Sequence, residues 1–151
     1  MKRAAVLALA AAVPLMSSFV APASASARTL APFLIKESAD FSSPTGPVET
    51  FQTAVGPFCG SGTFQDTVDS IVGSEVTITS MYTCADHSGT FSFRKTEDYT
   101  VRGDTATYHG PVTFLGGTGA YAFHSGQGVG FGQQNAAGIG SGVILGGLTT
   151  S

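Results

Sequence analysis

The most constraining feature of the sequence is a strict alternation of side-chain types between residues 75 and 84. Val76, Ile78 and Tyr82 fall on one face of an extended chain in this segment, and threonines fall on the other face. A period of two with many β-branched residues is typical of a β-strand in a sheet. We therefore predict a strand over residues 75–84.

Shorter runs with the same alternation recur along the chain, and clusters of glycine, proline or asparagine separate them. We predict seven or eight strands in all, the others being 48–55, 61–68, 90–102, 105–109, 112–115, 126–132 and 139–145. Short strands with frequent turn signals indicate an all-β sandwich or barrel. Glycines inside the strands favour closure into a single antiparallel β-barrel of about eight strands.

The N-terminal region has the three parts of a secretory leader. Two basic residues precede an apolar run at 4–13, and small residues follow up to an A-x-A sequence at 25–27. We predict a signal peptide over residues 1–27 and a secreted, extracellular protein; two earlier A-x-A sequences are alternative cleavage sites. The apolar run is too short to span a bilayer and ends at Pro14, so no membrane anchor is expected.

Residues 28–47 contain three prolines and show no clear period. They predict an extended lead-in, in which Phe33–Ile35 could add an edge strand. The β-barrel domain is then expected over residues 48–151. Its length suits one domain with a core of its own.

The charge of the chain argues against nucleic acid as a partner. Without the two basic residues of the predicted leader, the chain has five basic and ten acidic side chains, which gives a net charge of about minus five. No lysine or arginine follows Arg102. Such a surface repels a phosphate backbone.

Cys59 and Cys84 are the only cysteines in the sequence. In an exported chain an even number of cysteines predicts a disulfide, here one that joins the start of one strand to the end of its neighbour. A zinc site is the alternative, because Cys84 and His87 have ligand spacing. A structural zinc needs four protein ligands and no second pair is present, so we expect no metal.

The motifs of common chemistries are missing from the sequence. There is no G-x-G-x-x-G, no P-loop lysine and no G-x-S-x-G. His87, His109 and His124 are scattered and match no metal-binding spacing. We expect no cofactor.

One group of residues could support chemistry. If Phe91 and Phe93 point into the barrel, strict alternation brings Lys95, Glu97 and Tyr99 to the same face. Lys95 and Glu97 would then need each other, because a lone buried charge is costly. Burial would make Glu97 a candidate general acid or base, with Tyr99 orienting a ligand.

Further candidates for the lining of the lumen are Tyr82 and Asp66, together with Phe91 and Phe93. The alternative is that a bulge near residues 94–95 turns both charges into water. Lys95 and Glu97 would then form an exposed pair of little energetic value.

The glycine-rich segment 114–122 predicts a hairpin. Gly116, Gly117 and Gly119 would supply positive φ angles at the turn, after which Tyr121 and Phe123 re-enter a strand. These glycines are expected to be structural. A phosphate loop is not supported, because the lysine and helix that it needs are missing.

The Leu115–Ala122 motif, followed by Gly126-Gln127-Gly128, resembles the hairpin and small-residue strand of the dirigent and allene oxide cyclase barrel superfamily. The sequences around Cys59 and Cys84 are similar to those of small exported actinobacterial proteins that carry this hairpin. The resemblance implies an eight-stranded antiparallel barrel with a mostly apolar lumen, assembled as dimers or trimers. The functional residues of the superfamily have no matching motif here.

Three functions follow from these observations. The first is a binding module that holds a small hydrophobic ligand in the barrel lumen. The second is a dirigent- or cyclase-like enzyme that guides the cyclisation or coupling of a hydrophobic intermediate. The third is a structural or surface-interaction domain whose barrel is filled by its own phenylalanines. An open lumen with facing ionisable groups would favour the enzyme.

Overall fold

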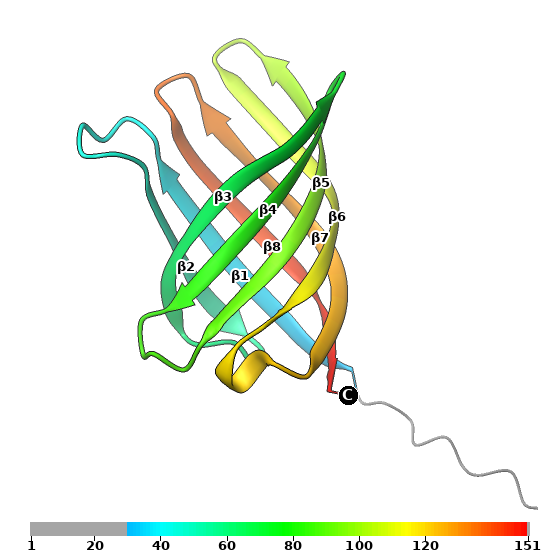
Figure 1. The fold of residues 1–151 in the computed structure, drawn as a ribbon. Helices are drawn as coiled ribbons and strands as arrows, with labels where there is room; N and C mark the ends of the chain where they lie inside the picture. Colours follow the sequence, from blue (N-terminus) through cyan, green and yellow to red (C-terminus); the bar gives the residue numbers. More distant parts are fainter. Residues whose placement is uncertain (1–29, 151) are drawn as a thin grey trace, which may run out of the picture.

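A computed structural model describes residues 30–150, which form one closed antiparallel barrel of eight strands (Figure 1). One 3₁₀ turn, η1 (Gly119–Tyr121), precedes β7. The strands are β1 (Ala31–Asp40), β2 (Val48–Val55), β3 (Ser61–Val72), β4 (Glu75–Cys84), β5 (Thr90–Arg102), β6 (Thr105–Gly117), β7 (His124–Asn135) and β8 (Ile139–Thr150). The predicted all-β barrel is confirmed. The predicted signal peptide at 1–27 lies outside the described residues.

The barrel begins at Ala31, so the predicted start at residue 48 was too late. Strand β1 pairs with β2 on one side and with β8 on the other, and it thereby closes the sheet. Phe33, Ile35 and Glu37 point inward from β1 with the expected alternation. Pro32 is compatible with the strand because it lies at its beginning. The three prolines of this region masked the alternation in the sequence.

A second correction concerns β6, which runs without interruption through Gly110 and Pro111, where we expected a break. Gly110 allows the strands to approach closely, because a Cβ atom there would meet the carbonyl oxygen of Thr96 at 1.8 Å. Pro111 still pairs in register with Val129 of β7. Gly110, which signals a turn in the sequence, here allows β5 and β6 to approach closely.

Aromatic side chains fill one end of the barrel, which we call the closed end. Phe58, from the loop between β2 and β3, stacks on Phe91 with ring centroids 4.3 Å apart. Burial of this many rings provides most of the apolar core. The buried aromatic residues are Phe33, Phe51, Phe58, Phe64, Tyr82, Phe91, Phe93, Phe114 and Tyr121.

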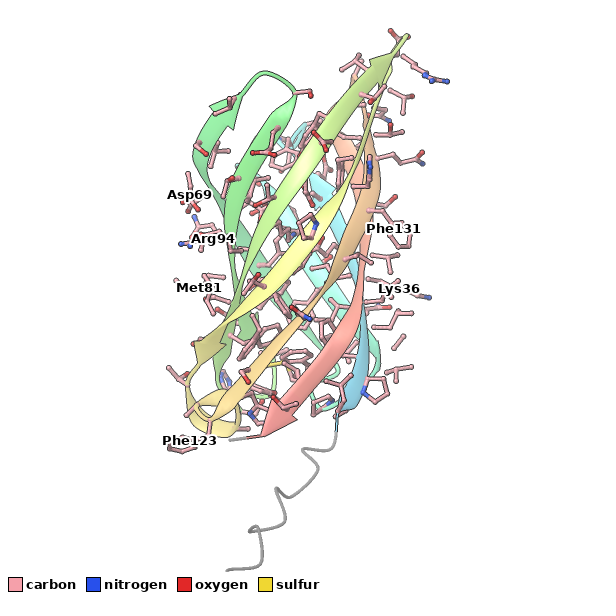
Figure 2. The ribbon with its side chains drawn as sticks, turned by 90° about the vertical axis from the view of Figure 1, so that its right-hand side faces the viewer. Lys36, Asp69, Met81, Arg94, Phe123 and Phe131 are labelled. Atoms are coloured by element: carbon pink, nitrogen blue, oxygen red, sulfur yellow. A yellow bond between two sulfur atoms is a disulfide. The ribbon has the colours of Figure 1, made fainter. Side chains whose placement is uncertain are left out.

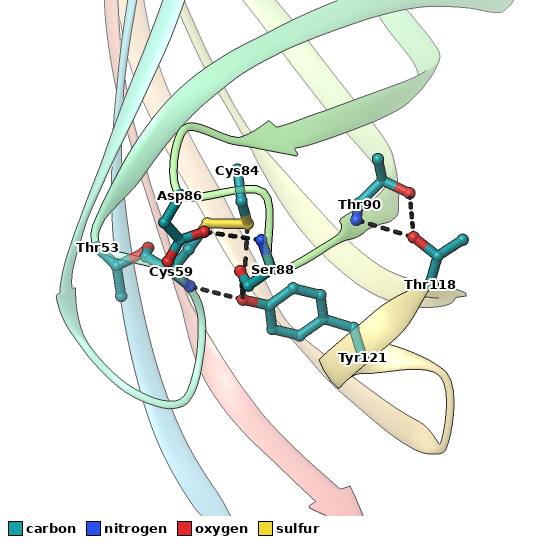
Figure 3. The surroundings of a disulfide bond; sticks show 8 residues. All are labelled: Thr53, Cys59, Cys84, Asp86, Ser88, Thr90, Thr118 and Tyr121. Atoms are coloured by element: carbon teal, nitrogen blue, oxygen red, sulfur yellow. Dashed lines mark hydrogen bonds between the residues drawn. A yellow bond between two sulfur atoms is a disulfide. The ribbon is translucent and has the colours of Figure 1, made fainter.

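The disulfide between Cys59 and Cys84 lies at the closed end and confirms the predicted pairing (Figure 3). Asp86 is near both sulfur atoms, but sulfurs joined to each other are not thiolate ligands for zinc. The hydroxyl of Tyr121 accepts a hydrogen bond from the Cys59 N–H at 2.9 Å and lies 3.2 Å from the Ser88 hydroxyl. Tyr121 therefore ties η1 to the disulfide.

The glycine-rich segment forms the turn that the sequence predicted, with two differences. Gly116 and Gly119 have φ angles of 115° and 57°. Gly117 has no positive φ, but a Cβ there would lie 2.4 Å from the Thr90 carbonyl oxygen. Tyr121 and Phe123 do not re-enter a strand, because η1 intervenes and β7 begins only at residue 124.

The outside of the barrel carries the side chains that alternate with the core. Figure 2 shows Asp69 and Arg94 together on the outer surface, and their ion pair measures 4.0 Å. Phe131 and Lys36 also point outward.

Strands β6, β7 and β8 contain no lysine, arginine, aspartate or glutamate. Among residues 30–150 no helix is long and apolar enough to cross a membrane.

Candidate functional site

A cavity of about 600 Å³ occupies the other end of the barrel, which we call the open end. The hairpins between β1 and β2, β3 and β4, β5 and β6, and β7 and β8 surround its mouth (Figure 1). Its walls combine apolar and ionisable side chains. The ionisable residues are Glu37, Glu49, Asp66, Lys95, Glu97, Tyr99 and Tyr108.

Strand β5 brings three of the predicted residues into this cavity. Lys95 and Glu97 are 3% and 2% exposed, and both line the cavity with Tyr99. The bulge considered near residues 94–95 does not form there. The irregularity in the pairing of β5 with β6 lies between Ser92 and Phe93, and the alternation continues unchanged beyond it.

Lys95 pairs with Glu37 of β1, and the expected pair with Glu97 is not the one that forms. The Lys95 ammonium donates a hydrogen bond of 2.6 Å to Glu37 Oε1, and the Tyr82 hydroxyl donates to the same oxygen. Lys95 also lies 5.4 Å from the ring centre of Phe64. Burial alone would lower the pKa of Lys95, but the carboxylates of Glu37 and Asp66 raise it above its usual value. Lys95 therefore stays charged.

Glu97 has no such ion pair. The Tyr99 hydroxyl donates to Glu97 Oε2 over a long distance of 3.3 Å. Burial raises the pKa of Glu97 to about 7, although the nearby charge of Lys95 opposes the shift. At neutral pH this carboxyl group exists in both protonation states, as a general acid or base requires.

Two further carboxylates face the cavity from neighbouring strands. Asp66 of β3 accepts a hydrogen bond from the Ser80 hydroxyl. Glu49 of β2 is 9% exposed. Burial is the main cause that raises the pKa of both groups, and it acts on Glu49 together with the charge of Asp66.

The sequence analysis identified part of this site and missed the rest. Asp66, Lys95, Glu97 and Tyr99 line the cavity as expected. Phe91, Phe93 and Tyr82 face the lumen but are fully buried in the closed end, below the cavity. Three ionisable lining residues were missed, namely Glu37, Glu49 and Tyr108.

Signals for two of the missed residues were present in the sequence. Glu37 continues the alternation of Phe33 and Ile35, so an inward glutamate could have been inferred once that segment was accepted as a strand. Glu49 similarly alternates with Phe51. Tyr108 lies just before Gly110, where a break was expected.

The carboxylates of the cavity are too far apart to form a cage for one metal ion. Among residues 30–150, only Cys59, Cys84 and Asp86 bring three potential ligand atoms within 4.8 Å of one another. Two of those atoms belong to the disulfide. The cavity is therefore suited to a molecule that extends between its acidic groups.

The fold and the cavity define the class of the protein as a closed eight-stranded barrel with one filled end and one open, acidic end. Comparison of the chain with protein-family models, curated proteins and solved structures found no match.

Proposed function

We propose that this protein is a secreted barrel that binds a small amphipathic molecule in its open end and transfers a proton to or from it through Glu97. The observation that carries the proposal is a carboxyl group, 2% exposed and with a pKa of about 7, that lines an open cavity. The disulfide is consistent with the oxidising surroundings of an exported protein.

The position of the open space supports an amphipathic ligand over a wholly hydrophobic one. Aromatic rings fill the apolar half of the lumen, and the Phe58 ring packs on Phe91 within it. The cavity lies toward the open end, where Phe64 and Ile78 lie among carboxyl and phenol groups. A ligand there has both an apolar wall and polar partners.

The arrangement supports an isomerase- or cyclase-like reaction. Glu97 Oε2 accepts a hydrogen bond from the Tyr99 hydroxyl, while Oε1 accepts no hydrogen bond from the described residues. In the proposed step Oε1 takes a proton from one atom of the bound molecule and returns it to another. Such a shift needs no cofactor, and its net result is an isomer of the starting molecule.

Binding without catalysis is the second candidate. The ion pair between Lys95 and Glu37 favours it, because a neutral, hydrogen-bonded pair can fix the orientation of a ligand without taking part in chemistry. The two candidates differ only in the role of Glu97. A third candidate, the filled barrel, describes the closed end but not the open one.

Native mass spectrometry of the full chain, expressed with its own leader in its native host, tests the proposal. The wild type is compared with Glu97→Gln and with Asp98→Asn, which removes a carboxylate from the outer face of the same strand. Each bound molecule is released and its chromatographic retention is measured. We expect the wild type and Asp98→Asn to hold one molecule, and Glu97→Gln to hold an isomer of equal mass and different retention.

The other outcomes separate the candidates. The same molecule in all three proteins would support binding without catalysis. A lumen that is empty in all three would overturn the proposal as a whole. The same spectra count subunits and so test the expected assembly into homo-oligomers.

A further inference from the structure

The charges in the cavity of the open end do not balance. Lys95 is paired with Glu37 at 2.6 Å, and this pair is neutral as a unit. Within residues 30–150, no lysine, arginine or histidine nitrogen lies within 4.0 Å of Glu49, Asp66 or Glu97. Three carboxyl groups therefore share one space with a single lysine that is already paired with Glu37.

Glu97 shows most clearly that this space lacks a partner. It is 2% exposed, yet its only hydrogen bond in the described part of the chain is the 3.3 Å contact with Tyr99. Buried carboxylates normally receive several hydrogen bonds or a cation. A ligand bound in the cavity would supply the hydrogen bonds or the positive charge that the protein does not.

The protonation behaviour of the three groups agrees with this view. Burial is the first cause of the raised pKa of Glu49, Asp66 and Glu97. A carboxyl group with a raised pKa is one whose negative charge is poorly compensated. A positive charge placed between them would lower all three pKa values.

Aromatic rings stand beside the carboxylates. The rings of Tyr99 and Tyr108 lie 5.3 Å apart at the cavity wall, and Phe64 forms another part of that wall. The faces of aromatic rings attract organic ammonium groups. The spread of the carboxylates argues against a single metal ion, as described above.

From this arrangement we infer that the open end binds a small organic cation, whose ammonium group is attracted by the spread negative charge of Glu49, Asp66 and Glu97 and whose apolar body lies against Phe64 and Tyr99. The inference rests on the proposed binding of a small molecule in this cavity and names the class of that molecule.

A matched series of three probes tests the inference on the full chain. At pH 8 the Kd values of 2-phenylethylammonium, 2-phenylethanol and 3-phenylpropanoate are measured by calorimetry or NMR titration. These probes share a phenyl ring and differ in charge. We expect the cation to bind at least about tenfold more tightly than the alcohol, and the anion to bind most weakly.

Variants locate the site. Glu97→Gln and Asp66→Asn should each weaken binding of the cation by about fivefold or more, because each removes one negative charge from a poorly solvated space. The alcohol should be affected by less than about twofold. Asp98→Asn is the control, since its carboxylate is exposed on the outer face of β5. A loss of cation binding in Asp98→Asn equal to that in Glu97→Gln would contradict the location.

The pH dependence gives a second reading with benzyltrimethylammonium, whose charge does not titrate. Its affinity should fall from pH 8 to pH 5, because protonation of the carboxylates removes their charge. The other titratable groups that line the cavity with Glu97 are Glu37, Glu49, Asp66, Lys95, Tyr99 and Tyr108. Of these groups, Glu97 takes up a proton within this range, because burial raises its pKa to about 7. Strands β7 and β8 contribute glycines, Gln134 and Ser141 to the lining.

Failure of this inference can be told apart from failure of the proposed function. Equal binding of the alcohol and the cation would overturn the organic cation and leave a small-molecule site in place. No binding of either cation at millimolar concentration would also overturn it, and the molecule retained from the native host would then decide the proposed function. Tighter binding of the anion would show that Lys95 is the dominant charge.

Discussion

The ammonium group of Lys95 lies 2.6 Å from the carboxylate of Glu37, which projects from β1 on the opposite side of the barrel from β5. This contact crosses the lumen. On one side of it lie the stacked rings of Tyr82 and Phe91, and on the other side lies the cavity. The ion pair thus marks the boundary between the filled and the open half of the barrel.

Removal of one member of this pair should be strongly destabilising. Lys95→Met leaves Glu37 buried without its cation, and we expect a loss of about 3 to 5 kcal/mol in the free energy of unfolding. Arg94→Met is the control, because Arg94 forms an exposed pair with Asp69 that contributes less than about 1 kcal/mol. Urea denaturation of both variants measures the difference.

A double variant distinguishes the uncompensated charge from lost packing. Lys95→Met combined with Glu37→Gln removes both charges, so it should recover much of the stability that Lys95→Met loses. Equal instability of the single and double variants would contradict this explanation.

The raised pKa of Glu97 predicts how stability depends on pH. The pKa rises from 4.5 in the unfolded chain to about 7 in the folded protein. Between these values the folded state binds a proton that the unfolded state has released, so stability falls as the pH increases through this window. Glu97→Gln removes this contribution. The free energy of unfolding of Glu97→Gln minus that of wild type should therefore increase as the pH rises from 5 to 8.

Urea denaturation at pH 5, 6, 7 and 8 measures this relative change. Asp98→Asn serves as the control, because its carboxylate lies exposed on the outer face of the same strand. A constant difference for Glu97→Gln would show that the folded protein does not raise the pKa of this group.

Local patterns in the sequence predicted most of the barrel but not its closure. The alternation was clear in β4 and β5, where Val76 and Ile78 in one strand and Phe91 and Phe93 in the other occupy consecutive inward positions. Strand β1 was less evident because prolines surround it, and it is the strand that joins both ends of the sheet. The glycine and proline inside β6 gave a false turn signal, since only the neighbouring strand explains their presence.

The sequence predicted which residues of one strand share a face of the site, but not which residues of different strands pair with each other. Alternation along β5 correctly placed Lys95 and Glu97 on one face. The partner of Lys95 is 58 residues away in the sequence, and its position depends on the register of several strand pairs. Residue patterns do not fix that register over such distances. The nearer acid, Glu97, was therefore taken as the partner.

The hydrogen bond from the Cys59 N–H to the Tyr121 hydroxyl should stabilise the closed end. Tyr121→Phe keeps the ring but leaves this buried N–H without a partner, which should cost about 1 to 3 kcal/mol. Ser125→Ala is a suitable control because its hydroxyl pairs with Thr149 on the exposed surface. Thermal denaturation with the disulfide intact measures both, and equal melting temperatures for Tyr121→Phe and wild type would contradict the assigned role.

The glycines before β7 should be needed for folding, for two different physical reasons. Gly119 has a φ of 57°, and a Cβ there would lie 2.3 Å from the carbonyl oxygen of Ser88. Gly117 has an ordinary φ, but its Cβ would meet the Thr90 carbonyl oxygen. Gly119→Val should therefore suffer from both backbone strain and overlap, and Gly117→Val from overlap alone.

We expect each substitution to lower the free energy of unfolding by about 2 kcal/mol or more, and Gly119→Val to be the less stable of the two. Gly60→Val is the control, because a Cβ at Gly60 meets no atom within 4 Å. Melting temperatures of the three variants test this. If Gly117→Val and Gly119→Val both melt with the wild type, the close contacts of the turn with residues 88–90 do not hold the closed end together.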